Sequence, residues 1–162
     1  MSDNLLGLNV FIDSARHLCA WLEGPPMDPV HGVNTALKLL SNIHSEAMLL
    51  PVSDDMKDDI NAPTVCEDHI QSMKVRLADF PLKRFDLNNP CDSTVELKSF
   101  NIYSTFALIL PYIKNGLDYY EQGQRETALN YWQKGFYYHW GTLVAGFIFA
   151  LQSYINSEST AP

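Results

Sequence analysis

The sequence predicts an all-α fold, a single-domain antiparallel bundle of about five helices with a long aromatic-rich C-terminal helix. Apolar residues recur at spacings of three and four along most of the 162 residues, as on the buried face of a helix. No segment alternates with period two over a useful length, so no sheet is expected. The composition, 46% hydrophobic and 19% charged, is typical of a globular domain that needs no disulfide or metal to fold.

The first two helices are indicated by apolar spacing and by the residues at their ends. Gly24-Pro25-Pro26 is expected to end the first helix, and Asp28-Pro29 to begin the second, because Asp can cap free N–H groups and Pro suits the first turn. Pro51 is expected to end the second helix. The two apolar stripes contain Leu5, Leu8, Ile12, Ala15, Cys19 and Leu22, and then Val30, Val33, Leu37, Leu40, His44 and Ala47.

The middle of the chain is less regular. Residues 51–63 are acidic and bounded by prolines, so they are predicted to form a surface loop. Capping-box spacing at residues 64–67 predicts the start of a short third helix, and the same spacing at 93–96 predicts the start of a fourth. Residues 80–92 are interpreted as an irregular connection. Pro111 is expected to kink or break the fourth helix.

The last helix is predicted to run from about Gln124 to Tyr154, so that residues 1–156 form the domain and 157–162 a disordered tail. Residues 124–162 contain only four charged residues but nine of the 19 aromatic residues, which predicts that this helix lies at the centre of the bundle. Its apolar stripe contains Leu129, Trp132, Phe136, His139, Leu143, Gly146 and Ala150.

Gly116, Tyr119, Ala128 and Trp132 have the spacing of one tetratricopeptide-type helical hairpin, in which a small residue lets two helices approach. No second copy follows at a fixed period. An ordinary helical hairpin, and not a solenoid, is therefore expected.

Charge limits the classes of partner. The net charge is -8 and the isoelectric point is near 4.9, with no basic stripe for a nucleic acid and a surface that works against anionic membranes. The sequence shows neither a secretory signal nor an apolar run of bilayer length, so a cytoplasmic protein is expected. Its three cysteines are far apart, and no Glu-x-x-His or His-Glu-x-x-His motif is present, so neither a metal nor another cofactor is expected.

The most unusual cluster is His139-Trp140-Gly141, with His139 on the apolar stripe. A buried histidine must find hydrogen-bond partners and can serve as an acid, a base or a ligand. The simpler interpretation is a core histidine bonded to a tyrosine or a carbonyl. The candidate ligand-binding residues are His139, Trp140, Trp132, Tyr138 and His44; no catalytic residue is assigned.

The stretch from Trp132 to Gly141 resembles an uncharacterised bacterial family, one of the domains of unknown function. Its members are similar in carrying a Trp, a Phe four residues on and then His-Trp-Gly, preceded by a Gly-Leu pair matched here by Gly116-Leu117. The chain departs from that pattern where a second histidine and paired acids often stand, at Leu143 and at Ser104-Thr105. The resemblance implies a small helical bacterial protein and no particular activity.

Three functions remain open on the sequence alone. The leading hypothesis is a non-enzymatic, acidic protein-interaction module that binds a basic protein partner. The alternative is a small-ligand-binding protein or enzyme with a pocket around His139 and Trp140. A homodimer is the third, because the rings of residues 131–155 exceed what one small bundle can hide.

Overall fold

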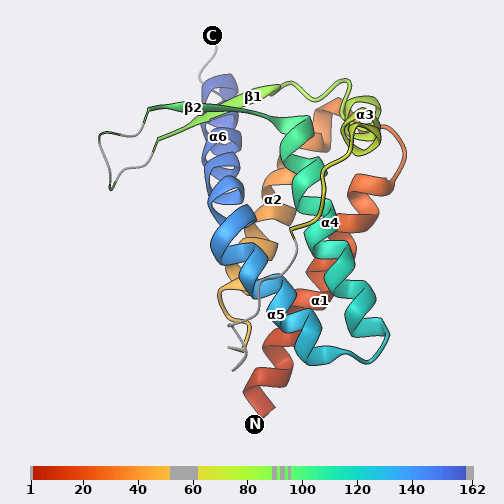
Figure 1. The fold of residues 1–162 in the computed structure, drawn as a ribbon. Coiled ribbons are helices and arrows are strands. Elements are labelled where there is room, and N and C mark those ends of the chain that lie inside the picture. Colours follow the sequence, from red (N-terminus) through yellow and green to blue (C-terminus); the bar gives the residue numbers. More distant parts are fainter. Residues whose placement is uncertain (1, 52–61, 89–90, 92–93, 95, 160–162) are drawn as a thin grey trace.

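Helices make up most of the computed structural model, which describes residues 2–51, 62–88, 91, 94 and 96–159 and confirms the mostly helical prediction (Figure 1). The predicted loop at 51–63 and the last residues of the predicted tail lie largely outside the described residues, as do the side chains of Leu5 and Val30. The helices are α1 (Ser2–Glu23), α2 (Pro29–Ala47), α3 (Glu67–Arg76), α4 (Ile102–Glu121), α5 (Arg125–Gly135), the π-helix η1 (Phe136–Trp140) and α6 (Gly141–Ser159).

The ends of α1 and α2 follow the predicted signals. α1 stops immediately before Gly24, and α2 begins at Pro29, where the Asp28 carbonyl accepts a hydrogen bond from the Gly32 N–H at 2.9 Å. The apolar faces pack together, with the described stripe residues of α1 buried. α2 ends at Ala47, before Pro51.

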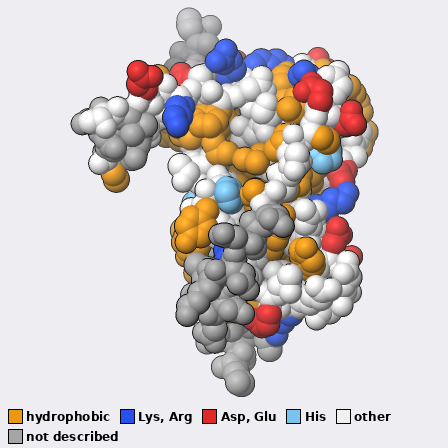
Figure 2. Space-filling model, viewed as in Figure 1, with side chains coloured by type: hydrophobic (Ala, Val, Ile, Leu, Met, Phe, Trp, Pro, Cys, Tyr) orange, Lys and Arg blue, Asp and Glu red, His pale blue; other side chains and the backbone are white. Residues whose placement is uncertain are grey.

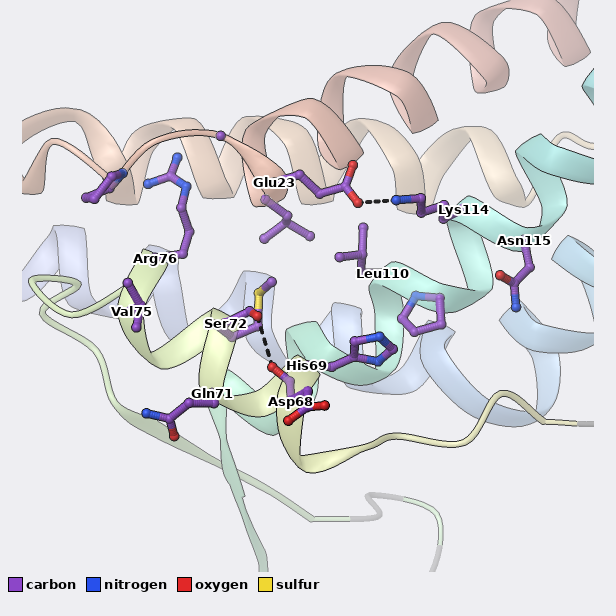
Figure 3. Close-up of a pocket in the computed structure, with 15 residues that line it drawn as sticks. Glu23, Asp68, His69, Gln71, Ser72, Val75, Arg76, Leu110, Lys114 and Asn115 are labelled. Carbon is purple, nitrogen blue, oxygen red and sulfur yellow. Dashed lines mark hydrogen bonds and ion pairs between the residues drawn. The ribbon is translucent and has the colours of Figure 1, made fainter.

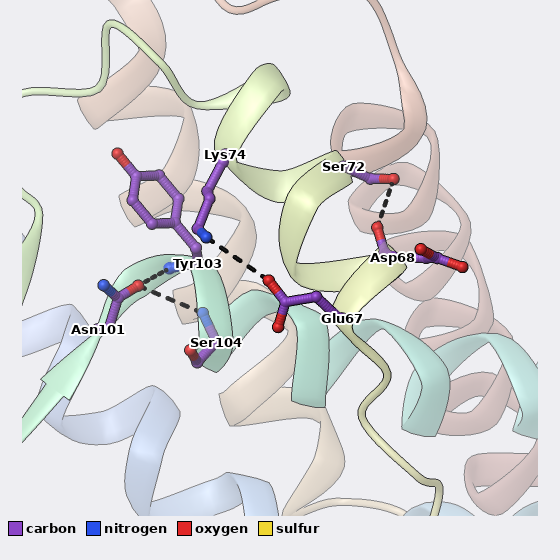
Figure 4. A network of polar contacts seen from close by, with 7 residues as sticks. All are labelled: Glu67, Asp68, Ser72, Lys74, Asn101, Tyr103 and Ser104. Carbon is purple, nitrogen blue, oxygen red and sulfur yellow. Dashed lines mark hydrogen bonds and ion pairs between the residues drawn. The ribbon is translucent and has the colours of Figure 1, made fainter.

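The capping-box predictions for α3 and α4 were wrong in position. α3 begins at Glu67, and its N-cap is Cys66, whose side chain makes no capping bond. α4 begins at Ile102, where Asn101 Oδ1 accepts hydrogen bonds from the backbone N–H groups of Tyr103 at 2.8 Å and Ser104 at 3.4 Å (Figure 4). An Asn cap has no partner residue at a fixed spacing, so it left no capping-box signature.

The interior of α4 and its C-terminal turn differ in how well they were predicted. The helix runs through Pro111 to Glu121, so of the kink or break expected there, the break is absent. Gly123 then adopts φ +79°, a conformation that favours glycine, and turns the chain into α5, which begins at Arg125, one residue after the start predicted at about Gln124.

A two-stranded sheet corrects the prediction that no strand is present. β1 (Arg84–Leu87) pairs antiparallel with β2 (Lys98–Asn101), and the hairpin lies across α6 (Figure 1). Phe85 is buried, and its ring stacks on Phe147 of α6 at 5.0 Å and on Phe100 at 5.6 Å. Four-residue strands are too short to show a clear alternation of apolar and polar residues, so the sequence did not predict them.

The predicted last helix is one rod with a change of phase inside it. Up to Phe136 the predicted stripe is the buried one, but from the end of η1 onward the fully buried large residues are Trp140, Val144, Phe147 and Leu151. A π-helix inserts an extra residue into one turn, so every later side chain rotates by about one position. The rod continues to Ser159, past the predicted start of the tail at 157.

The centre of the bundle is α4, not the C-terminal rod. α4 packs against α1, α3, α5 and β2, and its Phe106 ring contacts Phe147 of α6 at 5.1 Å. α6 packs on α2 and β1 and leaves one face exposed. The prediction failed because low charge in a helix does not require burial on all sides.

Candidate functional site

A pocket of about 830 Å³ opens between the C-terminal end of α1, the short helix α3 and the middle of α4 (Figure 3). Its size lies within the range of small-molecule sites. Apolar walls are supplied mainly by Leu22, Met73, Leu110 and Pro111, and polar groups stand among them.

The fold builds this pocket by tying α3 to the end of α1. Arg76 Nε donates a hydrogen bond to the carbonyl of Trp21 at 3.0 Å, and Met27 N–H donates to the carbonyl of Arg76 at 3.2 Å. The Trp21 carbonyl lies in the last turn of α1, where no intrahelical donor is available, so the arginine satisfies a group that would otherwise need water.

Arg76 is the most unusual group in the wall. Its side chain is 9% exposed, and its guanidinium lies 5.4 Å from the centroid of the Trp21 ring. Nη1 is buried without an acceptor, and no carboxylate among the described residues forms an ion pair with it. Burial lowers the pKa of this guanidinium, as expected when a charge loses water without gaining an anion.

An ion pair lines the α1 and α4 side of the pocket. Lys114 Nζ donates to Glu23 Oε1, and this hydrogen bond raises the pKa of the lysine despite its partial burial (Figure 3). Cys19 lies nearby in α1, where burial, with a smaller contribution from Glu23, raises the pKa of its thiol to about 12. The thiol therefore stays protonated and is unsuited to nucleophilic chemistry.

The α3 side carries exposed polar groups. His69 points toward the α4 wall, and Ser72 Oγ donates to the Asp68 carbonyl at 2.9 Å (Figure 3). Outside the pocket lining, Lys74 Nζ pairs with Glu67 Oε1 of the same helix at 3.7 Å (Figure 4). The pocket thus has charged side chains on all three helices, Glu23 on α1, Asp68 and Arg76 on α3 and Lys114 on α4, and α3 adds uncharged hydrogen-bonding groups.

None of the five residues predicted to line a ligand pocket lines this one. Trp132 and Trp140 are fully buried in the core. Trp132 Nε1 donates to the Ile113 carbonyl at 3.1 Å, and its ring lies 4.9 Å from Phe11.

The phase change at η1 explains why His139 is exposed; Tyr138 lies beside it in η1, and His44 lies in α2. His139 and Tyr138 are exposed, which corrects the expectation that His139 is a core histidine; its ring stacks on Tyr112 at 5.4 Å. His44 is half-buried with its ring 5.1 Å from Phe136, and burial lowers the pKa of its imidazole. Two of the five residues are thus buried, two are exposed and one is half-buried, and their shared role in binding stays a prediction.

The pocket residues were missed because they come from three segments with no common motif. Arg76 stands close to Lys74 and Asp79 in the sequence, and nothing in that order of residues marks its side chain as buried. A motif search cannot find such a site, because it exists only where α1, α3 and α4 meet.

Two classes of site find no support in the described part of the chain. No three His, Cys, Asp or Glu side chains there are grouped as metal ligands would be. None of the helices that the structure describes combines the length and the apolar character needed to cross a bilayer.

Comparison with known proteins identifies a family and a fold. A family model described as a domain of unknown function, DUF5063, matches residues 7–157, which confirms the resemblance to an uncharacterised family. The crystal structure of protein BF1032 from Bacteroides fragilis, a Northeast Structural Genomics Consortium target, is similar with a TM-score of 0.68. That similarity extends over 91% of this chain and 90% of the other at 23% identity, and therefore shows the fold alone. No curated protein matches the chain.

Proposed function

The chain belongs to the DUF5063 family of domains of unknown function, and on that premise we propose that it binds a small organic anion in the α1–α3–α4 pocket. This is the small-ligand function considered from the sequence, placed at a different site. Binding without catalysis is the simplest version, because the pocket pairs Lys114 with Glu23 and the nearby Cys19 thiol is held protonated.

The observation that carries the proposal is the uncompensated charge of Arg76. A buried guanidinium normally has an acceptor for each N–H group that loses water, because an unpaired buried charge costs on the order of 3–5 kcal/mol. An anion beside Arg76 would supply what the described residues do not. Guanidinium groups recognise carboxylates through paired N–H donors, which favours that chemistry.

The rest of the lining favours one negative charge on an apolar skeleton. The pocket contains two cationic groups, Arg76 and Lys114, and two carboxylates, Glu23 and Asp68. A ligand with several negative charges, such as a triphosphate, would be repelled by the acids. Leu22, Leu110 and the other apolar wall residues suit a compact hydrocarbon or aromatic part.

The test compares benzoate with benzamide, which has the same shape and no charge. Isothermal titration and thermal denaturation of the whole chain are expected to show binding of benzoate and at least tenfold weaker binding of benzamide, a difference of about 1.4 kcal/mol. Arg76→Met is expected to abolish the preference, and Arg76→Lys to keep part of it because the charge remains. Arg84→Met serves as the matched control, since Arg84 is exposed and bonds only Ser99 Oγ among the described partners.

Equal binding of the two probes, or an unchanged preference in a folded Arg76→Met variant, would contradict the proposal. So would a failure of benzoate and of a panel of small aliphatic carboxylates to stabilise the protein at any concentration tested. Circular dichroism of each variant distinguishes lost binding from lost folding.

The net charge of -8 favours a second candidate, a module that binds a basic protein partner. Most carboxylates that the structure describes are exposed, among them Asp13, Asp86 and Glu126. Such an association is steered by charge and weakens as salt screens it. Capture experiments at low and high salt test it: recovery of only the protein itself under both conditions would exclude this candidate.

A further inference from the structure

One face of the C-terminal rod is exposed along most of its length and has the spacing of a helix-packing surface. Its members, at alternating intervals of four and three residues, are Tyr138, Thr142, Ala145, Phe149, Gln152 and Asn156. Tyr138 is 70% exposed and Phe149 is 73% exposed, the latter the highest value among the large exposed hydrophobic side chains that the structure describes. Alternating steps of three and four are the pattern that a second helix requires of its partner.

This face lacks charge in a strongly acidic protein. α6 contains a single charged residue, Glu158, near its C-terminal end. Because this face has no charged side chain, it offers no favourable electrostatic contact to a charged partner. Two copies of a chain with net charge -8 repel each other, and they can meet at low electrostatic cost only through an uncharged surface.

The four residues of this face from Tyr138 to Phe149 are placed symmetrically along the rod. Thr142 and Ala145 are small and lie at the centre, and Tyr138 and Phe149 stand four residues outside them on either side. An antiparallel copy of the same helix, related by a two-fold axis between positions 142 and 145, would place each Phe149 against the partner's Tyr138. The small residues would face one another, which permits close approach of the two helices over about 16 Å.

From this self-complementarity we propose that a second copy of this chain docks antiparallel on the Tyr138–Phe149 face of η1 and α6, forming a two-fold symmetric dimer. The interface buries the exposed aromatic rings of both copies and leaves the acidic surfaces outside. Residues of α1, α3 and α4 form the ligand pocket, so the dimer does not depend on the proposed function.

Sedimentation equilibrium of the whole chain at micromolar concentration tests the dimer. The native protein is expected to be dimeric, and Ala145→Glu to be monomeric because it places two carboxylates at the centre of the interface. Phe149→Ser is expected to weaken association at least tenfold. Leu97→Glu, at another large exposed apolar residue outside α6, is the control and is expected to remain dimeric.

Cysteine pairing tests the orientation in a background where the exposed Cys66 and Cys91 are replaced by serine. A mixture of Thr142→Cys and Ala145→Cys chains is expected to form the mixed disulfide dimer in preference to either variant alone. Preferential cross-linking of Ala145→Cys to itself would instead indicate a parallel dimer and overturn the proposed geometry. A monomeric native protein, or a dimer that survives Ala145→Glu with its fold intact, would overturn the interface itself.

Discussion

Gly116 sets the distance between α4 and α5. A Cβ atom at this position would overlap the indole of Trp132, and that indole donates a hydrogen bond to the Ile113 carbonyl one turn earlier on α4. The spacing of Gly116 and Trp132 in the sequence predicted this close approach, and the structure confirms it.

We therefore expect Gly116→Ala to lower the free energy of unfolding by about 1–3 kcal/mol, because the core must shift to admit the methyl group. Gly7→Ala is the matched control: its Cβ would lie in ordinary contact, 3.6 Å from the Leu49 carbonyl oxygen, on a helix. That control is expected to be neutral or to stabilise by up to about 1 kcal/mol, because Ala favours the helix. Urea denaturation measures both, and equal effects would contradict the packing argument.

His44 is the histidine whose burial predicts a pH dependence. Desolvation lowers the pKa of the folded imidazole below its ordinary value of 6.5, although a hydrogen bond to the backbone of Gly141 opposes the shift. The unfolded chain therefore binds a proton more readily than the folded one as the pH falls. Stability should be unaffected well above 6.5 and should decrease below it.

The measurement is the free energy of unfolding from about pH 7.5 to about pH 5.5, in the native protein and in His44→Gln. We expect a shallower decrease in the variant. His17→Gln replaces an exposed histidine and should leave the native slope unchanged. A slope that is the same in all three proteins would show that His44 does not cause it.

At the scale of the element, the hairpin packs closely on α6 because Gly146 of α6 has no side chain. A Cβ atom at Gly146 would overlap Leu87 of β1, and beside this contact Phe85 stacks on Phe147. An isolated two-stranded hairpin is marginal in water, so β1 and β2 depend on this packing for their stability.

Gly146→Ala is consequently expected to destabilise the protein by about 1–3 kcal/mol, even though Ala favours a helix over Gly by about 1 kcal/mol. In the double variant Gly146→Ala with Leu87→Ala, space is restored, so its loss should be smaller than the sum of the single losses by at least about 0.5 kcal/mol. Hydrogen exchange should increase in β1 and β2 of the single glycine variant. Strict additivity of the two changes would indicate that the residues do not compete for this space.

For the molecule as a whole, the packing of α4 against most other elements favours a single cooperative unit. Trp132 and Trp140 are fully buried in α5 and η1, whereas Trp21 is half-buried at the end of α1, so tryptophan fluorescence samples both sides of the bundle. Each of these positions contacts residues of the common core.

We expect urea unfolding followed by tryptophan fluorescence and by far-ultraviolet circular dichroism to give coincident transitions, as a two-state domain does. Trp21→Phe should leave the midpoint from fluorescence equal to that from circular dichroism. Two separate transitions, with α6 melting apart from the remainder, would contradict the prediction that residues 1–156 form one domain.

The candidate site shows why more of the fold than of the candidate site could be predicted from the sequence. Helix periodicity and the Gly-Pro signals at α1 and α2 are local, and they predicted most of the helices and the approach of Gly116 to Trp132. His139, by contrast, was assigned to the buried stripe because a regular helix was assumed from Gln124 onward. The extra residue in η1 turned it to the surface.

The sequence by itself determined the helical class, the uncharged character of the C-terminal rod and the resemblance to a family without a known activity, since each depends on the order of residues along one segment. Tertiary structure alone decided that α4 is central, that Arg76 is buried beside a pocket and that an uncharged face of α6 is left open. The reason is that burial and charge compensation depend on which segments, distant in the sequence, pack together, and a local sequence pattern does not specify those contacts.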